Sequence, residues 1–308
     1  PVEDQERSSL KVQEITDFEQ FRALEPCWNQ TLDKSQRPLV YLTYEWLSTW
    51  WKCHSVDGKQ LRVLVIKDSQ DILGLAPLMI VRERFFGLPI TKIEFISMAK
   101  YADSPANCSA SLDFIITDKH EKVIETIVSY LLHSQSHWQF LRLNPIAEDS
   151  ASLPLLQYEA LRRGYIFETR NVFTNACVYV EEDWKNSVFS RSKHVKRLAG
   201  MEQKLRQQGQ LKYTEYRSPA ELMKSYDEVL DIERRSWKWK KGVTINSAPY
   251  RDFYRLFAEE ASRKGWLRLA MMEVNEKRIA YDYNVQYAGN LEALKCSYDL
   301  AYCYLSPG

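Results

Sequence analysis

The chain contains 308 residues, of which 45% are hydrophobic, 13% aromatic and 27% charged, and its formal net charge is +1. A length well above the ~100–200 residues of a typical domain predicts two domains, and the composition excludes an intrinsically disordered protein. The near-zero net charge excludes a global field toward nucleic acid or an anionic membrane, so any contact with a polyanion must come from a local patch.

The sequence has no membrane span, secretory signal or metal-binding pattern. The longest apolar run, 72–81, has ten residues with a proline inside it, whereas a helix that spans a bilayer needs ~20. The segment that opens the chain is polar and acidic, so we expect no secretory leader. The six cysteines form no C-x-x-C pair and no zinc-type spacing with the five histidines. We therefore expect reduced thiols, no metal and a cytoplasmic location.

Hydrophobic periodicity in the first half predicts a mixture of strands and helices. A short strand is followed by two helical patterns and by β-type runs that are typical of an antiparallel meander. A helix, a strand, a helix ended by Gly164 and a final strand come next. In chain order these elements are expected at 11–15, 18–31, 44–54, 61–67, 72–84, 92–96, 112–116, 119–136, 138–143, 153–163 and 165–169.

The second half opens with a β-type run and a basic helix, and then repeats the beginning of the first half. One strand is followed by two helices and three strands. Pro219 opens the first of these helices, and the segments NEK and AGN form the two hairpin turns. The elements are expected at 173–180, 191–208, 211–216, 219–237, 249–264, 266–274, 279–287 and 291–298.

The shared order β-α-α-β-β-β predicts two tandem copies of one α/β (α+β) fold, with mixed, mostly antiparallel sheets flanked by helices. We place the two domains at 1–170 and 171–308. After its meander the first copy continues with further helices and strands, whereas the second reaches Ser306-Pro307-Gly308. Serine is typical of a helix N-cap and proline of the first helical position. By analogy with the first copy, we expect the second to lack about 50–60 residues.

A helix that starts directly after a central strand offers unpaired backbone N–H groups and the positive end of its dipole to a pyrophosphate. Ser306-Pro307-Gly308 fits this role, because glycine permits close approach and proline removes only a donor that has no partner there. The equivalent loop of the first copy, 117–120, has no glycine and carries Asp118. If one copy binds an anionic cofactor, we expect it to be the second; an ordinary turn at 306–308 is the alternative.

Several motifs, spread over nearly the whole chain, resemble those of a known family. Their order and spacing carry the likeness more than any single motif does. They are Tyr44-Glu45-Trp46-Leu47-x-x-Trp50-Trp51, Gly74-x-Ala76-Pro77-Leu78, Ser236-Trp237-Lys238 before Gly242, Phe253-Tyr254 before Gly265, Ile279-Ala280, and Lys295-x-x-Tyr298-Asp299-x-x-Tyr302-x-x-x-Ser306-Pro307-Gly308. With these motifs the chain resembles the CelD-like, FemAB-related branch of the GNAT superfamily of acyl-CoA N-acyltransferases.

The resemblance implies tandem GNAT folds, of which the second holds acyl-CoA, with acetyl-CoA as the expected donor, and transfers the acyl group to an amine. It also implies that backbone amides at the end of the fourth strand of that copy and in the following loop bind the thioester oxygen and the pyrophosphate. The cofactor-binding candidates are therefore Ser306, Pro307 and Gly308. The first copy is expected to bind no cofactor.

Direct attack by the amine needs a base for its proton and an acid for the departing thiolate. The resemblance makes Tyr298 and Tyr302 the candidate acids, and Asp299 the candidate base or the holder of the acceptor amine. Aromatic packing at a strand end and a turn cap are equally good interpretations of these residues. Four more residues are candidates for substrate binding, with a solvated face or core packing as the alternative for each: Lys295, Asp282, Trp237 and Lys238.

The helix predicted at 191–208 is strongly basic and contains one acid, Glu202. A solvated helix face is the structural interpretation of this run. Lys193, Lys196 and Arg197 lie three and four residues apart, so they share a helix face and are candidates for contact with an anionic acceptor.

The expected function is N-acylation of an amine by acyl-CoA. The resemblance implies an amino sugar or a glycan precursor of polysaccharide or envelope synthesis as the acceptor, by analogy alone. Two alternatives remain open. A FemAB-type transferase would take its acyl group from aminoacyl-tRNA, for which a near-neutral chain offers little basic surface. A catalytically inactive GNAT pair would be a binding module in a polysaccharide-synthesis complex. DNA is not an expected partner.

Overall fold

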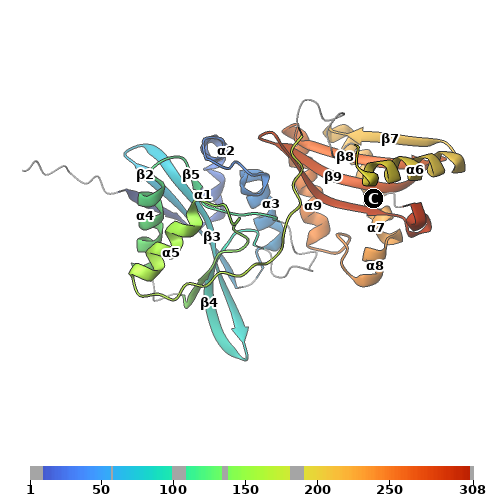
Figure 1. The fold of residues 1–308 in the computed structure, drawn as a ribbon. Helices are drawn as coiled ribbons and strands as arrows, with labels where there is room; N and C mark the ends of the chain where they lie inside the picture. The colour runs from blue at the N-terminus through green and yellow to red at the C-terminus, as the bar shows by residue number, and fades with distance from the viewer. Residues whose placement is uncertain (1–9, 57, 99–108, 134–137, 181–190, 306–308) are drawn as a thin grey trace, which may run out of the picture. The chain divides into compact units, whose positions relative to one another are not determined.

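The structure, a computed structural model, describes residues 10–56, 58–98, 109–133, 138–180 and 191–305. The chain divides into two compact units, Pro1–Val172 and Phe173–Gly308 (Figure 1). This division lies two residues from the predicted boundary between 170 and 171. No helix among the described residues is long and apolar enough to cross a membrane.

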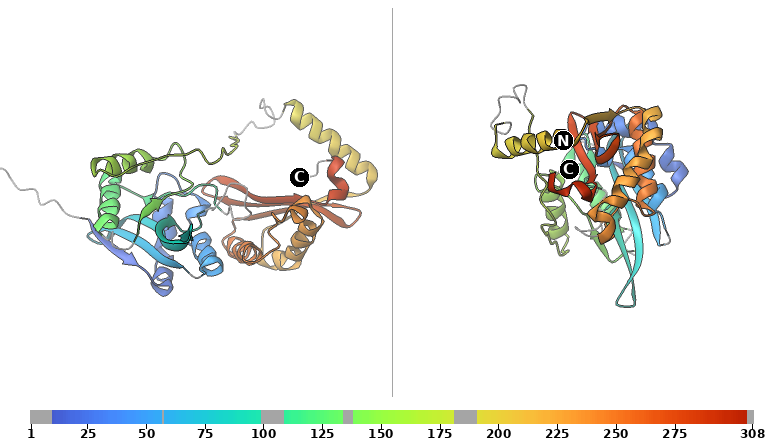
Figure 2. Two further views of the ribbon diagram at one scale, coloured as in Figure 1. Left: turned by 90° about the horizontal axis from the view of Figure 1, so that it is seen from below. Right: turned by 90° about the vertical axis from the view of Figure 1, so that its right-hand side faces the viewer.

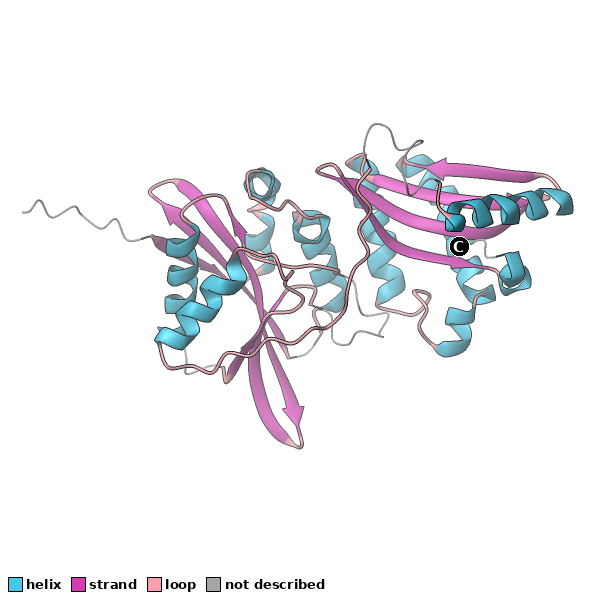
Figure 3. Ribbon diagram, viewed as in Figure 1, coloured by secondary structure: helices cyan, strands magenta, loops and turns pink. Residues whose placement is uncertain are grey.

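The first unit starts with a strand and three helices, continues with a long meander, and ends with two helices around a short strand (Figures 1 and 3). Its elements are β1 (Lys11–Ile15), α1 (Phe18–Arg22), α2 (Glu25–Asp33), the 3-10 helix η1 (Val40–Leu42), α3 (Tyr44–His54), β2 (Lys59–Asp68), β3 (Asp71–Phe85), β4 (Leu88–Phe95), β5 (Ile115–Ile116), α4 (His120–His133), β6 (Phe140–Arg142) and α5 (Ser152–Arg162).

The helix predicted at 18–31 is wrong in its extent, because the structure has two helices there. The Asp17 carboxylate caps α1 by accepting hydrogen bonds from the backbone N–H groups of Glu19 (2.8 Å) and Gln20 (3.1 Å). Pro26 lies in the first turn of α2, where it needs no hydrogen-bond partner. Since a proline cannot continue a preceding helix, it starts a new one.

Six strands of the first unit form one sheet with the order β1-β2-β3-β4-β6, and β5 pairs with β3 beside this series. All described pairings are antiparallel except that of β4 with β6. Helices α4 and α5 cover one face of the sheet and α1–α3 cover the other (Figure 2). Fully buried side chains fill both layers, such as Trp46 of α3 and Ile127 of α4. The predicted mixed, mostly antiparallel sheet with helices on its faces is confirmed.

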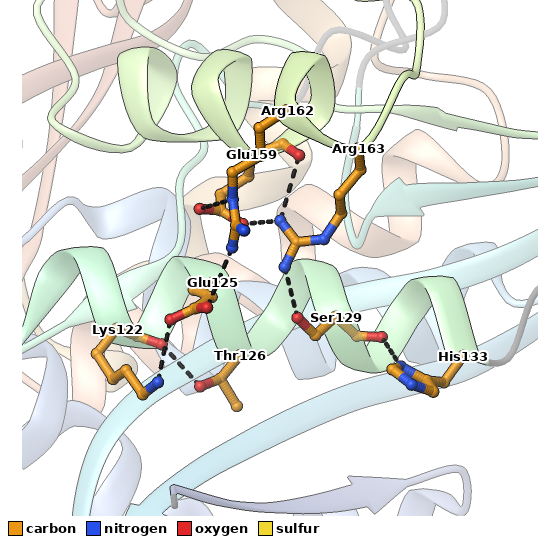
Figure 4. Close-up of polar contacts among 8 residues, drawn as sticks. All are labelled: Lys122, Glu125, Thr126, Ser129, His133, Glu159, Arg162 and Arg163. Carbon is orange, nitrogen blue, oxygen red and sulfur yellow. Dashed lines mark hydrogen bonds and ion pairs between the residues drawn. The ribbon is translucent and has the colours of Figure 1, made fainter. Parts of the chain in front are cut away.

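Ion pairs join α5 to α4 in the first unit (Figure 4). The buried carboxylate of Glu159 pairs with Arg163 and, at 2.8 Å, with Arg162. Both arginines also reach α4: Arg163 donates to the Ser129 hydroxyl at 2.7 Å, and Arg162 pairs with Glu125 at 3.0 Å. The two helices are therefore fastened to each other by one shared polar cluster, since every group in it has a partner.

Two predicted strands are absent, the last one of the first half and the one that opens the second half. The segments 165–169 and 173–180 form no ladder, and their side chains are mostly exposed. The predicted strand 112–116 is reduced to β5, because only Ile115 and Ile116 pair with β3. Alternation of apolar and polar residues stabilises a strand only where a neighbouring strand accepts its hydrogen bonds, and these segments have none among the described residues.

The second unit contains one four-stranded antiparallel sheet with the order β10-β9-β8-β7. Its elements are α6 (Lys193–Gln208), β7 (Leu211–Tyr216), α7 (Pro219–Arg235), α8 (Trp237–Lys241), α9 (Tyr250–Arg263), β8 (Leu267–Val274), β9 (Lys277–Tyr287), β10 (Asn290–Tyr298) and the 3-10 helix η4 (Leu300–Leu305). The order β1-β2-β3-β4 of the first sheet thus recurs as β7-β8-β9-β10, with helices after the first strand in both units. The predicted tandem repeat of one architecture is confirmed.

Helices cover the two faces of the second sheet unequally. Within this unit, α7 and α9 pack under one face, and α6 lies over the other (Figure 2). The single buried residue of α6 is Leu205. It joins Val274, Ile279 and Leu305 in what we call the α6 cluster, with Tyr302 and other partly buried residues around it. The other residues of α6 are exposed or only partly buried, so they add little apolar contact with the sheet.

A β-bulge in β9 supplies part of the α6 cluster. The register steps from the pair Ala280–Met272 to the pair Arg278–Glu273 and skips Ile279. A bulge of this kind turns two successive side chains to the same face of a sheet. Ile279 therefore faces the α6 cluster together with Met272, although strict alternation would turn it toward α7.

Candidate functional site

The end of β10 is held in place by Asp299. This residue is buried, and its carboxylate contacts Arg235 of α7, Lys277 of β9 at 2.8 Å and the backbone N–H of Ala301 at 2.9 Å. Burial alone would raise the pKa of Asp299, but the hydrogen bonds from Lys277, Ala301 and Arg235 outweigh burial and lower it. An ionised, fully paired carboxylate that caps a turn is well suited to positioning and poorly suited to accepting a proton.

The two candidate tyrosines lie in different surroundings. Tyr302, in η4, packs against the α6 cluster, and the Lys277 ammonium lies 5.5 Å from its ring centroid. Tyr298 is the last residue of β10, lies opposite Ala280 in the register and is partly exposed. Of the two phenols, the Tyr302 ring is thus committed to packing, and Tyr298 is the better placed for contact with a substrate.

Strand alternation separates Lys295 from Tyr298. Lys295 and Ser297 share one face of β10, and Cys296 and Tyr298 share the other. The ammonium of Lys295 lies 5.2 Å from the ring centroid of Tyr254, a residue of α9. The structure therefore turns Lys295 toward the helix-covered face, away from the side chain of Tyr298.

Lys238 and Asp282 lie beside Cys296, near the C-terminal end of β10. Lys238, in α8, donates a hydrogen bond to the backbone carbonyl of Cys296. Asp282 lies directly opposite Cys296 in the ladder. Although part of the Asp282 side chain is exposed, desolvation by the surrounding strands raises its pKa, and the nearby Lys238 opposes this effect. These two candidates are brought together at β10, and Trp237 lies beside Lys238 with its ring under the ammonium of Lys241.

Lys193 and Arg197 occupy the first turns of α6, where their side chains are exposed. Within the part of the chain that the structure describes, neither side chain makes an ion pair, whereas Arg206 near the other end of α6 pairs with Glu202 at 2.6 Å. The basic end of α6 therefore carries uncompensated positive charge. The cofactor candidates Ser306, Pro307 and Gly308 lie outside the described residues.

A buried acid of the second unit, Glu233, is not among the candidates predicted from the sequence. This residue of α7 is fully buried, and its carboxylate accepts hydrogen bonds from the Tyr281 hydroxyl (2.7 Å), the Thr244 hydroxyl (2.6 Å) and the Ile245 N–H (3.3 Å). Burial and the adjacent Glu233 raise the pKa of Tyr281 well above its usual value. A signal existed in the sequence, because Glu233 follows Val229 by four residues and so interrupts the apolar stripe of α7.

The first unit has a cleft of about 320 Å³ beside the start of α4. His120 and Arg37 line it, but Arg37 is paired with Asp149. Burial raises the pKa of another lining residue, Asp113, whose carboxylate accepts a hydrogen bond from Ser150. A cleft with two acids and a neutralised arginine is poorly matched to a pyrophosphate.

The family comparison concerns the second unit. Residues 192–308 match the model of an acetyltransferase (GNAT) domain. A search of curated proteins finds no match. The match supports acyltransferase activity in the part of the chain that contains β10 and the residues around it.

A likeness in fold to one solved structure extends over most of the chain. A structure titled as FemX aligns with a TM-score of 0.53 and 11% sequence identity over 96% of this chain and 82% of that one. A conserved protein of unknown function from Bacteroides thetaiotaomicron VPI-5482 aligns with a TM-score of 0.49 and 12% identity over 96% and 83%. An aminoglycoside acetyltransferase from an uncultured soil metagenomic sample, in complex with sisomicin, reaches a TM-score of only 0.32 at 12% identity over 56% and 97%.

At these identities the FemX likeness establishes the fold alone, while the family match concerns residues 192–308. The repeat of sheet order in the two units agrees with both findings. The acetyltransferase (GNAT) domain match therefore covers most of the second unit, and the chain as a whole shares the fold of the FemX structure.

Proposed function

We propose that the second unit transfers an acyl group, with acetyl as the expected one, from acyl-CoA to an amine. The observation that carries this proposal is the match of residues 192–308 to the acetyltransferase domain. Membership of the CelD-like branch, a cytoplasmic location and a first unit that binds no cofactor belong to the same proposal.

The residues around β10 fit an acyl-CoA in two respects. β10 ends the described sheet, so the backbone groups on its outer edge pair with no described strand and are suited to the amide groups of an extended pantetheine chain. Lys238 lies at this edge, and Lys240 and Lys241 follow it in α8 as positive charges for phosphate groups. Ser306, Pro307 and Gly308 are the proposed holders of the pyrophosphate.

Acyl-CoA would supply the activated thioester carbonyl. From this chain, the Tyr298 phenol is proposed to give its proton to the departing sulfur. Asp299 is proposed to position the β10 end through Arg235 and Lys277, because its own contacts leave it no free face for an amine. The exposed carboxylate of Asp282 is proposed to hold the ammonium of the acceptor. The ammonium gives one proton to solvent before it attacks the carbonyl carbon and a second as the C–S bond breaks, and the Tyr298 phenolate regains its proton from solvent.

The proposed acceptor is an amino sugar or a glycan precursor of polysaccharide or envelope synthesis. An amine of this class carries an ammonium, which suits the exposed carboxylate of Asp282 opposite Cys296 near the C-terminal end of β10. The resemblance of the sequence motifs supports the choice of pathway.

Transfer is tested by incubating the chain with acetyl-CoA and a panel of amino sugars, and by separating acetylated products by mass. Calorimetric titration with acetyl-CoA accompanies this assay. Binding and acetylated amine together are the expected result. Failure to bind acetyl-CoA would favour the binding-module alternative, and transfer that requires charged tRNA would favour the aminoacyl-transferase alternative.

A further inference from the structure

The tip of the β3–β4 hairpin in the first unit exposes three large apolar side chains. Phe85 is 58% exposed, Phe86 91% and Leu88 69%. The two phenylalanine rings meet edge to face with their centroids 4.5 Å apart. Gly87, with φ +82°, forms the turn between them and Leu88. We call Phe85, Phe86 and Leu88 the hairpin tip.

The hairpin tip stands on a ribbon that leaves the sheet. β2 accompanies β3 as far as Val81, and β6 accompanies β4 from Lys92 onward. In between, residues 83–85 pair only with residues 88–90 among the described strands. At ~3.3 Å per residue this ribbon projects by about 10 Å, as the long hairpin in Figure 1 illustrates.

Positive charge lies directly behind the hairpin tip. Arg82 and Arg84 are both exposed, and neither forms an ion pair within the described ranges. The acid between them, Glu83, is already neutralised by the buried Lys92, whose ammonium lies 2.7 Å from it. The base of the tip therefore presents two arginines without a compensating acid.

We propose that the hairpin tip inserts into the interfacial region of an anionic lipid bilayer, with Arg82 and Arg84 at the headgroups. Aromatic and leucine side chains beside arginine are the composition of interfacial anchors. Each arginine near an anionic membrane adds electrostatic attraction to the lipid headgroups. This attraction acts at longer range than the apolar contacts of the tip.

The shape of the tip favours a membrane over a protein as its occupant. The three side chains expose roughly 400 Å² of apolar surface, estimated from ~200 Å² for a large side chain, which is about half of the ~800 Å² that each partner buries in a standard protein interface. The tip is also convex and narrow. A bilayer accepts such a tip because lipid needs no complementary cavity.

Flotation of the full chain with vesicles tests the proposal independently of any enzymatic activity. We expect co-flotation with phosphatidylcholine vesicles that contain 30% phosphatidylserine, and at least tenfold weaker partition into pure phosphatidylcholine. The triple variant Phe85→Ser, Phe86→Ser, Leu88→Ser should lose co-flotation. Arg82→Gln with Arg84→Gln should lower it by at least tenfold on anionic vesicles and little on neutral ones.

Ile166→Ser is the matched control, because Ile166 is 97% exposed on a segment outside the hairpin, so this variant should bind as the unchanged chain does. Circular dichroism verifies that each variant is folded. Equal flotation of the tip variant and the unchanged chain would overturn the proposal, as would absence of flotation for the unchanged chain. Sedimentation that shows a dimer dissolved by the tip variant, without vesicle binding, would assign the tip to a second copy instead.

Discussion

The hydroxyl of Tyr281 donates a 2.7 Å hydrogen bond to the carboxylate of Glu233 in the interior of the second unit. This bond joins the central strand β9 to α7, and the Thr244 hydroxyl donates a further hydrogen bond to the same carboxylate. A buried acid is tolerated only when its oxygens are satisfied in this way. The pair therefore fixes the helix beneath the strands that carry the proposed site.

Replacing Glu233 by Gln should destabilise the second unit by about 1–3 kcal/mol, because the amide nitrogen would face donors that now lack an acceptor. Urea unfolding followed by circular dichroism measures this change. Asp227→Asn, on the exposed side of the same helix, is the control and should change the unfolding free energy by less than ~0.5 kcal/mol. Equal stability of the two variants would contradict the assigned network.

Replacing Asp299 by Asn should cost about 1–3 kcal/mol at pH 7, because Arg235 and Lys277 would lose a shared charged partner. Since the folded pKa of Asp299 lies below its usual value, the carboxylate stabilises the fold above pH ~3.9, and this contribution is lost as the pH falls through the folded pKa. The stability difference between the unchanged chain and Asp299→Asn should therefore shrink toward pH 3. A difference that grows on acidification would refute the ion-pair assignment.

His54 in α3 should make the first unit sensitive to mild acid. Burial lowers the pKa of His54 to about 4. Between this value and the unfolded pKa of ~6.5 only the unfolded chain binds the proton, so up to about 3 kcal/mol of stability is lost as the pH falls from 6.5 to 4. Denaturant unfolding of the unchanged chain and of His54→Phe across this range measures the effect, and the variant should show the flatter profile.

Tyr298→Phe should lower kcat for acetyl transfer by about 100-fold if the phenol is the general acid. Acetyl-CoA binding should change little, because the ring is kept. Tyr304→Phe is the matched control, since this exposed phenol of η4 contacts only Gln208 among the hydrogen bonds of the described chain. Equal activity of both variants would remove Tyr298 from the mechanism.

Charge reversal of Lys193, Lys196 and Arg197 should raise the KM for an anionic acceptor and leave kcat nearly unchanged, because the three exposed side chains are proposed to act in binding alone. Lys204→Glu, farther along α6, controls for the effect of a charge reversal elsewhere on the same helix. Steady-state kinetics with a charged and a neutral acceptor measure the effect. Unchanged kinetics would leave this face of α6 as a solvated surface.

Much of the fold could be predicted, because its elements carry strong local signals. The helix expected at 44–54 matches α3, whose first turn is capped by Thr43. The strands of both meanders were found from alternation and turn residues, and their shared order revealed the repeat. The segment 165–169 could not be judged in the same way, because its alternation contains no information about whether a neighbouring strand is present.

The candidate site was harder to predict. The position of a residue along a strand does not tell which distant side chains will contact it in the folded protein. Lys295 and Tyr298 are close in sequence, yet the pleat of β10 turns them to opposite faces. Asp299 looked like a catalytic group, while its two cationic partners come from 64 and 22 residues earlier in the chain. Such long-range pairs emerge only from tertiary packing, and the same is true of the hydroxyl groups that surround Glu233.

Helix α6 is anchored near its C-terminal end, at the buried Leu205, so a small tilt there would displace its N-terminal end. Lys193 lies twelve residues from this point, which corresponds to ~18 Å along a helix axis. A tilt of about 10° at the anchor would then carry the basic end through roughly 3 Å, the length of a hydrogen bond. Acceptors of different size could then contact the same cations, Lys193, Lys196 and Arg197. A helix packed along its whole length could not tilt in this way.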